Sequence, residues 1–301
     1  EAYFDQLLTD AVPTIYPKSV TPENNEAGTN SLYLTFHKGE IQSYCSKHGF
    51  TENNFFMTAF LQVLHRITRE KRVLISTINN GREANEMQEI MGMFVKTLPM
   101  ISNMSDGKQP MADAVETIQH QLFESVSRDC YPFTKMAARH DIHPAVMFTF
   151  QGDLGVDIQR EGIEQIRMKL DTAKVPLSVT VASYGETDYV IFLEYNTSMY
   201  AADDMQALAD ALQTFALKSI GENVLLKDIS LVEGEQFEEL MQISKGEEMD
   251  FDRSLTYVKE FVRQAAKTPD ALAVTDKFGQ FTYGELDAQS NIIARLLLQR
   301  G

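Results

Sequence analysis

The stretch PLSVTVASYGETDYVIFLEYNTSMYAADDM, residues 176–205, carries the clearest fold signal in the sequence. Apolar and polar residues alternate over 176–183 and again over 189–195, which is typical of β-strands with one buried face. The segment YGETD, residues 184–188, separates the two strands and predicts a hairpin-like loop. A long amphipathic helix is predicted to follow and to end at Gly221. Its inward-facing residues are Met205, Leu208, Leu212 and Phe215.

Four further strands are predicted upstream, over residues 31–37, 73–78, 93–100 and 145–150. Helices are predicted before Gly49, after Thr51 as an N-cap, and after Pro110 as a first-turn residue. The helix after Thr51 is apolar almost all round, so we expect it to lie in the core. Residues 1–30 contain three prolines and one glycine and are expected to be irregular. The pattern predicts an α+β lobe in which helices pack on a mixed sheet.

The composition excludes several classes of function. The chain has 301 residues and a formal net charge of −16, from 43 acidic and 27 basic side chains. Nucleic acids and anionic membranes bind through Lys and Arg, so we expect neither as a partner. With Cys45 and Cys130 as the only cysteines, a zinc site or disulfide framework is not expected, and a reducing, cytoplasmic environment is favoured. The chain starts at Glu1 rather than Met, and we expect a fragment of a longer protein.

The composition changes near residue 233. Residues 233–252 contain eight acidic residues and one Lys, which predicts a solvated linker or a short exposed helix. Beyond them the pattern predicts a helix that ends at Pro269, two short strands and a final helix. We therefore expect a lobe over 1–232, an acidic linker over 233–252 and a separate segment over 253–301.

Five stretches occur in an informative order along the chain. The first, VLISTINNGR at residues 73–82, resembles the strand that ends in Gly-Arg in the condensation domain family of nonribosomal peptide synthetases. IMGMFVKTL, residues 90–98, is similar to its Gly-x-Phe-Val-Asn-Thr-Leu motif. RDCYPF, residues 128–133, resembles His-Gln-Asp-x-Pro-Phe, and residues 141–148 resemble the Arg-Asp-x-Ser-Arg-x-Pro segment with its following strand. Residues 176–205 are similar to the family's closing hairpin and helix.

Residues 255–301 resemble a different domain, the start of an adenylation domain. Thr282, Tyr283, Glu285 and Leu286 match the Thr-Tyr-x-Glu-Leu motif that opens such domains. The resemblance places nucleotide-binding loops after residue 301, so this motif is expected to be structural here. The two resemblances together imply the C-terminal half of a condensation domain, a linker and an incomplete adenylation domain.

The resemblance implies a chloramphenicol-acetyltransferase-like fold and an amide-forming reaction between thioesters held on carrier proteins. The family's His-His-x-x-x-Asp-Gly signature supplies the imidazole for this reaction, and none of the six histidines here lies in it. We therefore expect no catalytic residue, no directly bound cofactor and no catalysis by this chain alone. The implied partners are peptidyl carrier domains with their phosphopantetheine, the N-terminal half of the condensation domain, and the adjoining adenylation domain.

Eight positions are candidates for a substrate tunnel or for family motifs. They are Gly81, Arg82, Phe94, Lys96, Thr97, Asp141, His143 and Asn196. Several also have structural explanations: Gly81 would serve a turn, Arg82 would pair with a carboxylate, and the strand after Phe94 would simply be buried. Lys96 stands where the family has Asn, and it is either a charge in the tunnel or a solvent-facing residue.

The histidines and the Pro-Phe motif have plain structural explanations. His140 and His143 flank Asp141, but their spacing fits no regular metal site, so no metal is expected. His65, on the apolar helix, is expected to be a core residue with satisfied hydrogen bonds. The segment 131–133 predicts a helix start rather than a binding site, and Arg128 stands where the family has His.

The second strand of the hairpin is apolar on both faces, because Val190 and Phe192 alternate with the inward-facing residues. In condensation domains a segment near here crosses over to the first half. We therefore expect unpartnered apolar surface, a tendency to self-associate, and first cleavage by protease within 233–252.

Three alternative functions stay open. They are a degenerate condensation-like binding or scaffold module, an epimerisation domain of the same fold, and a stand-alone acyltransferase that uses CoA. NNGR at 79–82, in place of Glu-Gly-His-Gly-Arg, disfavours epimerisation, and the adenylation-like segment disfavours the acyltransferase. The sequence contains no GxSxG, GxGxxG, Walker or HExxH motif.

Overall fold

The computed structural model describes residues 1–24, 28–82, 85–103, 107–153, 172–221, 224–246, 254–277 and 279–300. The chain divides into two compact units, Glu1–Glu238 and Glu239–Gly301. Within the described residues, no helix combines the length and the apolar character that crossing a bilayer requires.

The first unit is built on a mixed six-stranded sheet. Its strands are β1 (Thr29–His37), β2 (Arg72–Asn79), β3 (Lys96–Asn103), β4 (Val146–Asp153), β5 (Leu177–Tyr184) and β6 (Asp188–Asn196). They lie in the order β1-β6-β5-β4-β2-β3, with β4 parallel to β2 and β5 and the other pairs antiparallel. The predicted hairpin is confirmed, because β5 and β6 pair along their whole length down to Tyr184 and Asp188.

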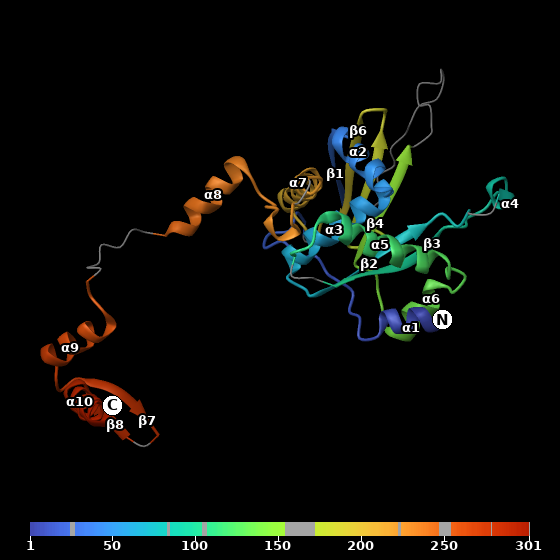
Figure 1. Cartoon of the computed structure of the whole chain (residues 1–301). Helices are drawn as coiled ribbons and strands as arrows, with labels where there is room; N and C mark the ends of the chain where they lie inside the picture. The colour runs from blue at the N-terminus through green and yellow to red at the C-terminus, as the bar shows by residue number, and fades with distance from the viewer. Residues whose placement is uncertain are drawn as a thin grey trace. The chain divides into compact units, whose positions relative to one another are not determined.

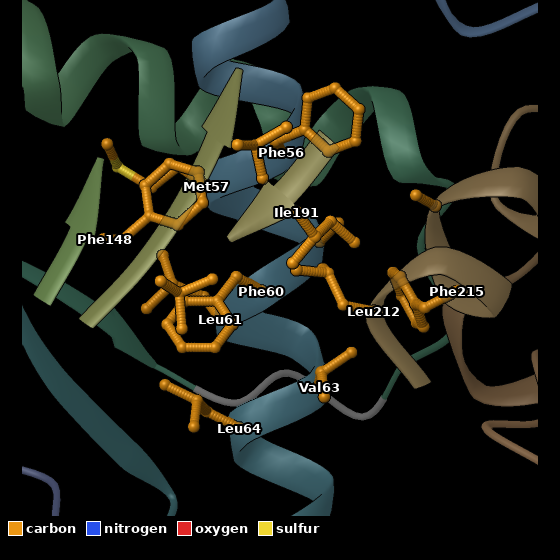
Figure 2. Packing of buried hydrophobic residues seen from close by; sticks show 14 of the residues in the cluster. Phe56, Met57, Phe60, Leu61, Val63, Leu64, Phe148, Ile191, Leu212 and Phe215 are labelled. Carbon is orange, nitrogen blue, oxygen red and sulfur yellow. The ribbon is translucent and has the colours of Figure 1, made fainter. Parts of the chain in front are cut away.

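Helices cover one face of this sheet (Figure 1). They are α2 (Gly39–His48), α3 (Glu52–Thr68), α5 (Met111–Val126) and α7 (Ala202–Lys218). Figure 2 shows α3 in the middle of the core, between strands of the sheet and α7. Phe56 and Phe60 are fully buried, which confirms the prediction of a core helix. Thr51 caps α3 as expected, since its hydroxyl accepts a hydrogen bond from the Asn54 N–H at 3.2 Å.

A second, smaller core lies on the opposite face, over β2 and β3. It is formed with α1 (Ala2–Leu8) and α6 (Phe133–His140). Its buried residues are Phe4, Leu8, Leu74, Leu98, Ile101, Met136 and Ile142. The helix α1 corrects the expectation of irregular structure over 1–30 for residues 2–8, whereas residues 9–24 contain no helix or strand. Seven residues are too few to show a helical period, and so short a helix is stabilised by its packing rather than by propensity.

The outer face of β1 and β6 carries apolar side chains, as predicted. Tyr33 is 46% exposed and stacks on Phe192, with ring centroids 4.7 Å apart. Val190 and Phe192 are half-buried. Exposed apolar surface of this kind is typical of a contact with a partner. Self-association of the chain stays a prediction.

Strand β3 begins later than the pattern predicts. The sequence pattern predicts a strand over 93–100, but β3 runs from Lys96 to Asn103, so Phe94 precedes it and Pro99 lies within it. Proline is tolerated in β3 because β3 is an edge strand, which has a neighbouring strand on one side only.

Arg66 of α3 ties the end of the first unit to the core. Its guanidinium donates hydrogen bonds to the carbonyl oxygens of Leu226 and Ile229, around a short 3-10 turn (Leu226–Asp228). It also lies over the Phe215 ring, 5.1 Å from the centroid. Burial lowers the pKa of Arg66, yet an arginine keeps its charge at neutral pH. Arg66 therefore helps to hold the segment after α7, together with the backbone hydrogen bonds from Leu226 to Gln109 and from Lys227 to Gly107.

Replacing Arg66 by Met is expected to lower the free energy of unfolding by about 2 kcal/mol, because two charge-assisted hydrogen bonds are lost while the apolar stem is kept. Urea denaturation followed by circular dichroism measures this loss. The exposed cation Lys71, replaced by Gln, is the matched control and is expected to change stability by less than about 0.5 kcal/mol. Equal effects of the two substitutions would contradict the prediction.

Most of the described residues after 232 are exposed. Every residue of α8 (Gly234–Lys245) is exposed, which agrees with the short exposed helix considered for 233–252, whereas residues 247–252 lie outside the described residues. The second unit contains α9 (Tyr257–Lys267), the antiparallel pair β7 (Leu272–Asp276) and β8 (Gly279–Thr282), and α10 (Tyr283–Arg300). The predicted helix, two strands and final helix are confirmed.

Candidate functional site

Three of the predicted positions lie together where β2 and β3 continue into a projecting loop. Residues 80–82 and 85–95, here called the arm, extend beyond the sheet and contain α4 (Asn85–Gln88) (Figure 1). Gly81 has φ +67°, and a Cβ atom there would lie 2.2 Å from the carbonyl oxygen of Phe94. Glycine is therefore required at position 81, because only glycine fits both the dihedral and the contact.

Arg82 holds the arm together from within. Its guanidinium donates hydrogen bonds to the carbonyl oxygens of Met87, Ile90 and Gly92, the last two at 2.8 Å. It also lies 4.7 Å from the centroid of the Phe94 ring. The expectation of a carboxylate partner for Arg82 is corrected by these contacts, since a planar group with five N–H donors satisfies a loop whose carbonyls converge. The same contacts explain why Phe94 belongs to the arm and not to β3.

The arm presents apolar side chains to solvent. The exposed ones are Met87, Ile90, Met91, Met93 and Val95. Met91 and Met93 are more than nine-tenths exposed, at 96% and 91%. Methionine is flexible and polarisable, so such a group adapts to the surface of a partner. The arm is therefore the strongest candidate in the first unit for a contact with substrate or another segment.

Lys96 is a partly exposed residue that forms an ion pair at the start of β3. Its Nζ lies 2.7 Å from Oδ1 of Asp129, and Oδ2 of Asp129 accepts a hydrogen bond from the Asn79 amide at 3.0 Å. The Lys96 side chain is 39% exposed and that of Asp129 only 13%. Thr97, the next residue, is half-buried in β3 opposite Ile78. The part played by Asp129 is not predicted by the sequence pattern, although the residue lies in the RDCYPF motif.

The structure places the other predicted positions away from the arm. Asp141 ends α6 with φ 52°, and its carboxylate and the His143 imidazole are almost fully exposed, 3.5 Å apart. His140 instead lies 2.9 Å from Asp5 of α1. Asn196 is the last residue of β6, and its side-chain oxygen accepts hydrogen bonds from the N–H and hydroxyl of Ser198 in the turn that follows. Neither region collects groups suited to catalysis, and the described part of the chain has no cluster of three metal-ligating side chains.

The remaining motif residues are structural, as expected. Pro132 is the N-cap of α6, so the segment 131–133 starts a helix. His65 is fully buried, with Nδ1 2.8 Å from the Glu70 carbonyl oxygen and Nε2 3.0 Å from the Ser102 hydroxyl. Burial lowers the pKa of His65, outweighing the Glu70 contact, so the imidazole is neutral. A core histidine with both nitrogens bonded is therefore confirmed.

The pKa shift of His65 makes stability depend on pH. In the unfolded chain the imidazole binds a proton below pH about 6.5, whereas in the folded chain it does so only at lower pH. The contribution of neutral His65 to the free energy of unfolding is therefore fully present above that pH. It is lost as the pH falls, by at most about 1.4 kcal/mol per pH unit. Between pH 7.5 and 5.5, wild-type protein is expected to lose about 1 kcal/mol more than His65→Gln in urea denaturation. An identical pH dependence of both proteins would contradict this.

In the second unit, the motif at 282–286 proves to be a capping box. The Thr282 hydroxyl accepts a hydrogen bond from the Glu285 N–H at 3.2 Å, and the Glu285 carboxylate accepts from the Thr282 N–H at 2.9 Å. This reciprocal pair starts α10 and has the Thr-x-x-Glu spacing that such caps require. The Tyr283 ring lies near Phe261 of α9, with centroids 6.1 Å apart. The motif is thus structural within the described residues.

The sequence is similar to a known protein family and to several of its members. The sequence model of the condensation domain family matches residues 1–241. Bacitracin synthase 3 of Bacillus licheniformis is 23% identical over 273 residues, which is 87% of this chain and 4% of the synthase. Gramicidin S synthase 2 of Brevibacillus brevis is 25% identical over an alignment of 320 residues, which covers 100% of this chain and 7% of that synthase. The chain thus spans a small part of the length of these relatives.

Solved structures show the same fold. A four-domain nonribosomal peptide synthetase bound to AMP and glycine has a TM-score of 0.66 at 16% identity, covering 100% of this chain and 25% of that one. The first condensation domain of the calcium-dependent antibiotic synthetase has a TM-score of 0.60 at 15% identity, covering 77% of this chain and 52% of that one. The epimerization domain from the third module of tyrocidine synthetase B has a TM-score of 0.57 at 16% identity. The predicted fold class is confirmed.

Proposed function

The chain belongs to the condensation domain family, and from this we propose that residues 1–232 are the C-terminal lobe of a domain that joins two carrier-bound thioesters through an amide bond. In this reaction the amine of the acceptor attacks the thioester carbonyl of the donor. The C–N bond forms, the C–S bond breaks, and the amine proton is transferred so that the donor's phosphopantetheine leaves as a thiol. The observation that carries the proposal is the family match across the whole first unit.

The catalytic imidazole of this reaction would come from another segment. The 301 residues contain no His-His-x-x-x-Asp-Gly motif, and the one fully buried histidine among the described residues, His65, is engaged in the core. The compared condensation domain supports a half-domain, because 77% of this chain covers only 52% of that structure. We propose that the first half of the domain packs against the apolar arm and against the outer face of the sheet around Tyr33 and Phe192. This would bury side chains that are exposed here.

The second unit supports a proposed neighbour, an adenylation domain that begins near residue 253. The capped helix α10 carries exposed apolar residues in positions that a folded domain would bury. They are Ile292, Ile293, Leu296, Leu297 and Leu298. The structure of the four-domain synthetase matches the full length of this chain, including this unit. Peptidyl carrier domains with phosphopantetheine complete the proposed set of partners, and no cofactor is assigned to this chain itself.

The test compares the 301-residue chain with the two-lobed protein of its parent. Each is mixed with a donor and an acceptor carrier domain, both loaded with aminoacyl-phosphopantetheine, and the carriers are examined by intact mass spectrometry. The two-lobed protein is expected to produce dipeptidyl carrier, and this chain alone is expected to give no more than the no-enzyme control. Dipeptide from the chain alone would contradict the need for a first half. Loaded carriers that stay unchanged with the two-lobed protein would favour the scaffold alternative, and inversion of the donor's α-carbon would favour epimerisation.

A further inference from the structure

The root of the arm is closed by one carboxylate. Asn79 and Lys96 face each other as the last pair of the β2–β3 ladder, so their side chains point to the same side of the sheet. Asp129 bridges this pair, with one oxygen on each partner, at 3.0 Å and 2.7 Å. These three residues, here called the clasp, join the strands that enter and leave the arm.

Asp129 is itself anchored through its backbone and its neighbour Arg128. It lies in the turn after α5, where its N–H donates to the carbonyl oxygen of Val126 at 3.1 Å. The preceding Arg128 lies 2.7 Å from Glu124 of α5 and 4.9 Å from the centroid of the Tyr3 ring. The carboxylate is therefore attached, through its own backbone and through Arg128, to α5 and to Tyr3 of α1 rather than to the arm. Movement of the arm at its root would have to break contacts to this fixed point.

We propose that Asp129 is a positioning residue, whose carboxylate clamps Asn79 and Lys96 and so sets the direction in which the arm leaves the sheet. The role of Asp129 in function rests on the proposed function, because only there does the arm contact the first half of the condensation domain and the substrate. Arg82 gives the arm its internal shape, and the clasp attaches that shape to the sheet. Lys96 stands at the family's Asn position. It makes this attachment an ion pair, in which the Asp129 side chain is only 13% exposed.

Substitutions at the clasp separate its charge from its shape. Asp129→Asn keeps the volume but places an amide N–H₂ against either Asn79 or Lys96, so that donor faces donor. Lys96→Met keeps the length of the side chain and removes the ammonium. Lys96→Arg keeps the charge and the donors, and is the conservative rescue. Lys218→Met is the matched control, because Lys218 forms another half-exposed ion pair, with Glu233, far along the chain from the arm.

Hydrogen exchange of the 301-residue chain, read by mass spectrometry over residues 85–98, tests the clasp without any need for catalysis. Asp129→Asn and Lys96→Met are expected to speed exchange there about tenfold, the effect of losing one charge-assisted hydrogen bond. Lys96→Arg and Lys218→Met are expected to stay within about twofold of wild type, and so are β5 and β6 in every variant. Unchanged exchange over 85–98 in both clasp variants, or equal acceleration in β5 and β6, would overturn the proposal.

The role in function is read in the two-lobed protein by single-turnover dipeptide formation from loaded carriers. Lys96→Met is expected to slow the reaction about tenfold at saturating carrier, and Lys96→Arg to recover most of that loss, at unchanged thermal stability. A wild-type-like rate for Lys96→Met would overturn the positioning role. If the wild-type two-lobed protein makes no dipeptide, the proposed function fails, while the exchange experiment still decides whether the clasp holds the arm.

Discussion

Replacing Phe60 by Ala is expected to lower the free energy of unfolding of the first unit by about 3–5 kcal/mol. Phe60 is fully buried in the middle of α3, and its ring stacks on that of Phe148 in β4 with centroids 5.7 Å apart. Figure 2 shows it among side chains from α3, the sheet and α7, so the space it leaves is enclosed on several sides. Close-packed neighbours relax only in part, and the cavity adds to the lost transfer free energy.

The matched control for Phe60 is the same substitution at Phe123, whose side chain on α5 is 67% exposed. Phe123→Ala is expected to change stability by less than about 0.5 kcal/mol. Both variants are compared with wild type by urea denaturation, with fluorescence of the tyrosines and circular dichroism as independent probes. Should Phe60→Ala fail to fold, Phe60→Leu is expected to cost less, about 1–2 kcal/mol, and remains measurable. Equal costs at Phe60 and Phe123 would show that α3 is not the centre of the core.

The sequence predicts well those elements whose pattern of apolar residues extends over many consecutive positions. The β5–β6 hairpin follows from alternation on both sides of a five-residue polar segment, and α3 from a run that is apolar almost all round. The helix α1 is missed because Phe4 and Leu8 give only one helical repeat. Its existence depends on burial against residues more than sixty positions away, such as Leu74.

The candidate site shows the same limit more sharply. The dihedral need of Gly81 can be anticipated from a glycine after Asn-Asn, but the partners of Arg82 cannot, because they are carbonyl groups, which every residue carries. The apolar residues before Lys96 fit a strand as well as they fit a loop. The contacts of Arg82 with the loop backbone, which the sequence does not reveal, decide for the loop. Asp129 meets Asn79 and Lys96 only through the fold, since 50 and 33 residues separate it from them. A carboxylate that contacts distant segments produces no periodic pattern in the sequence by which it could be predicted.

Replacing Gly81 by Ala is expected to destabilise the first unit by about 3 kcal/mol, because two separate costs add. The backbone has φ +67°, where an L-residue is strained, and the new Cβ would lie 2.2 Å from the carbonyl oxygen of Phe94. That oxygen is a backbone atom, so relief requires the backbone around Phe94 to shift. The movement would break the contact of Arg82 with the Phe94 ring, so the arm is expected to lose order along with stability.

Two other glycines separate these costs. Gly185 has φ +61°, and a Cβ atom added there would meet no other atom within 4 Å, so Gly185→Ala carries the dihedral cost alone, about 1 kcal/mol. Gly39 begins α2 with open space and no positive φ, so Gly39→Ala is expected to be neutral or slightly stabilising. Urea denaturation gives the three values, and hydrogen exchange over residues 85–98 shows whether the excess at Gly81 arises in the arm. If Gly81→Ala costs no more than Gly185→Ala, the close approach of Phe94 does not constrain the arm, and its shape depends on Arg82 alone.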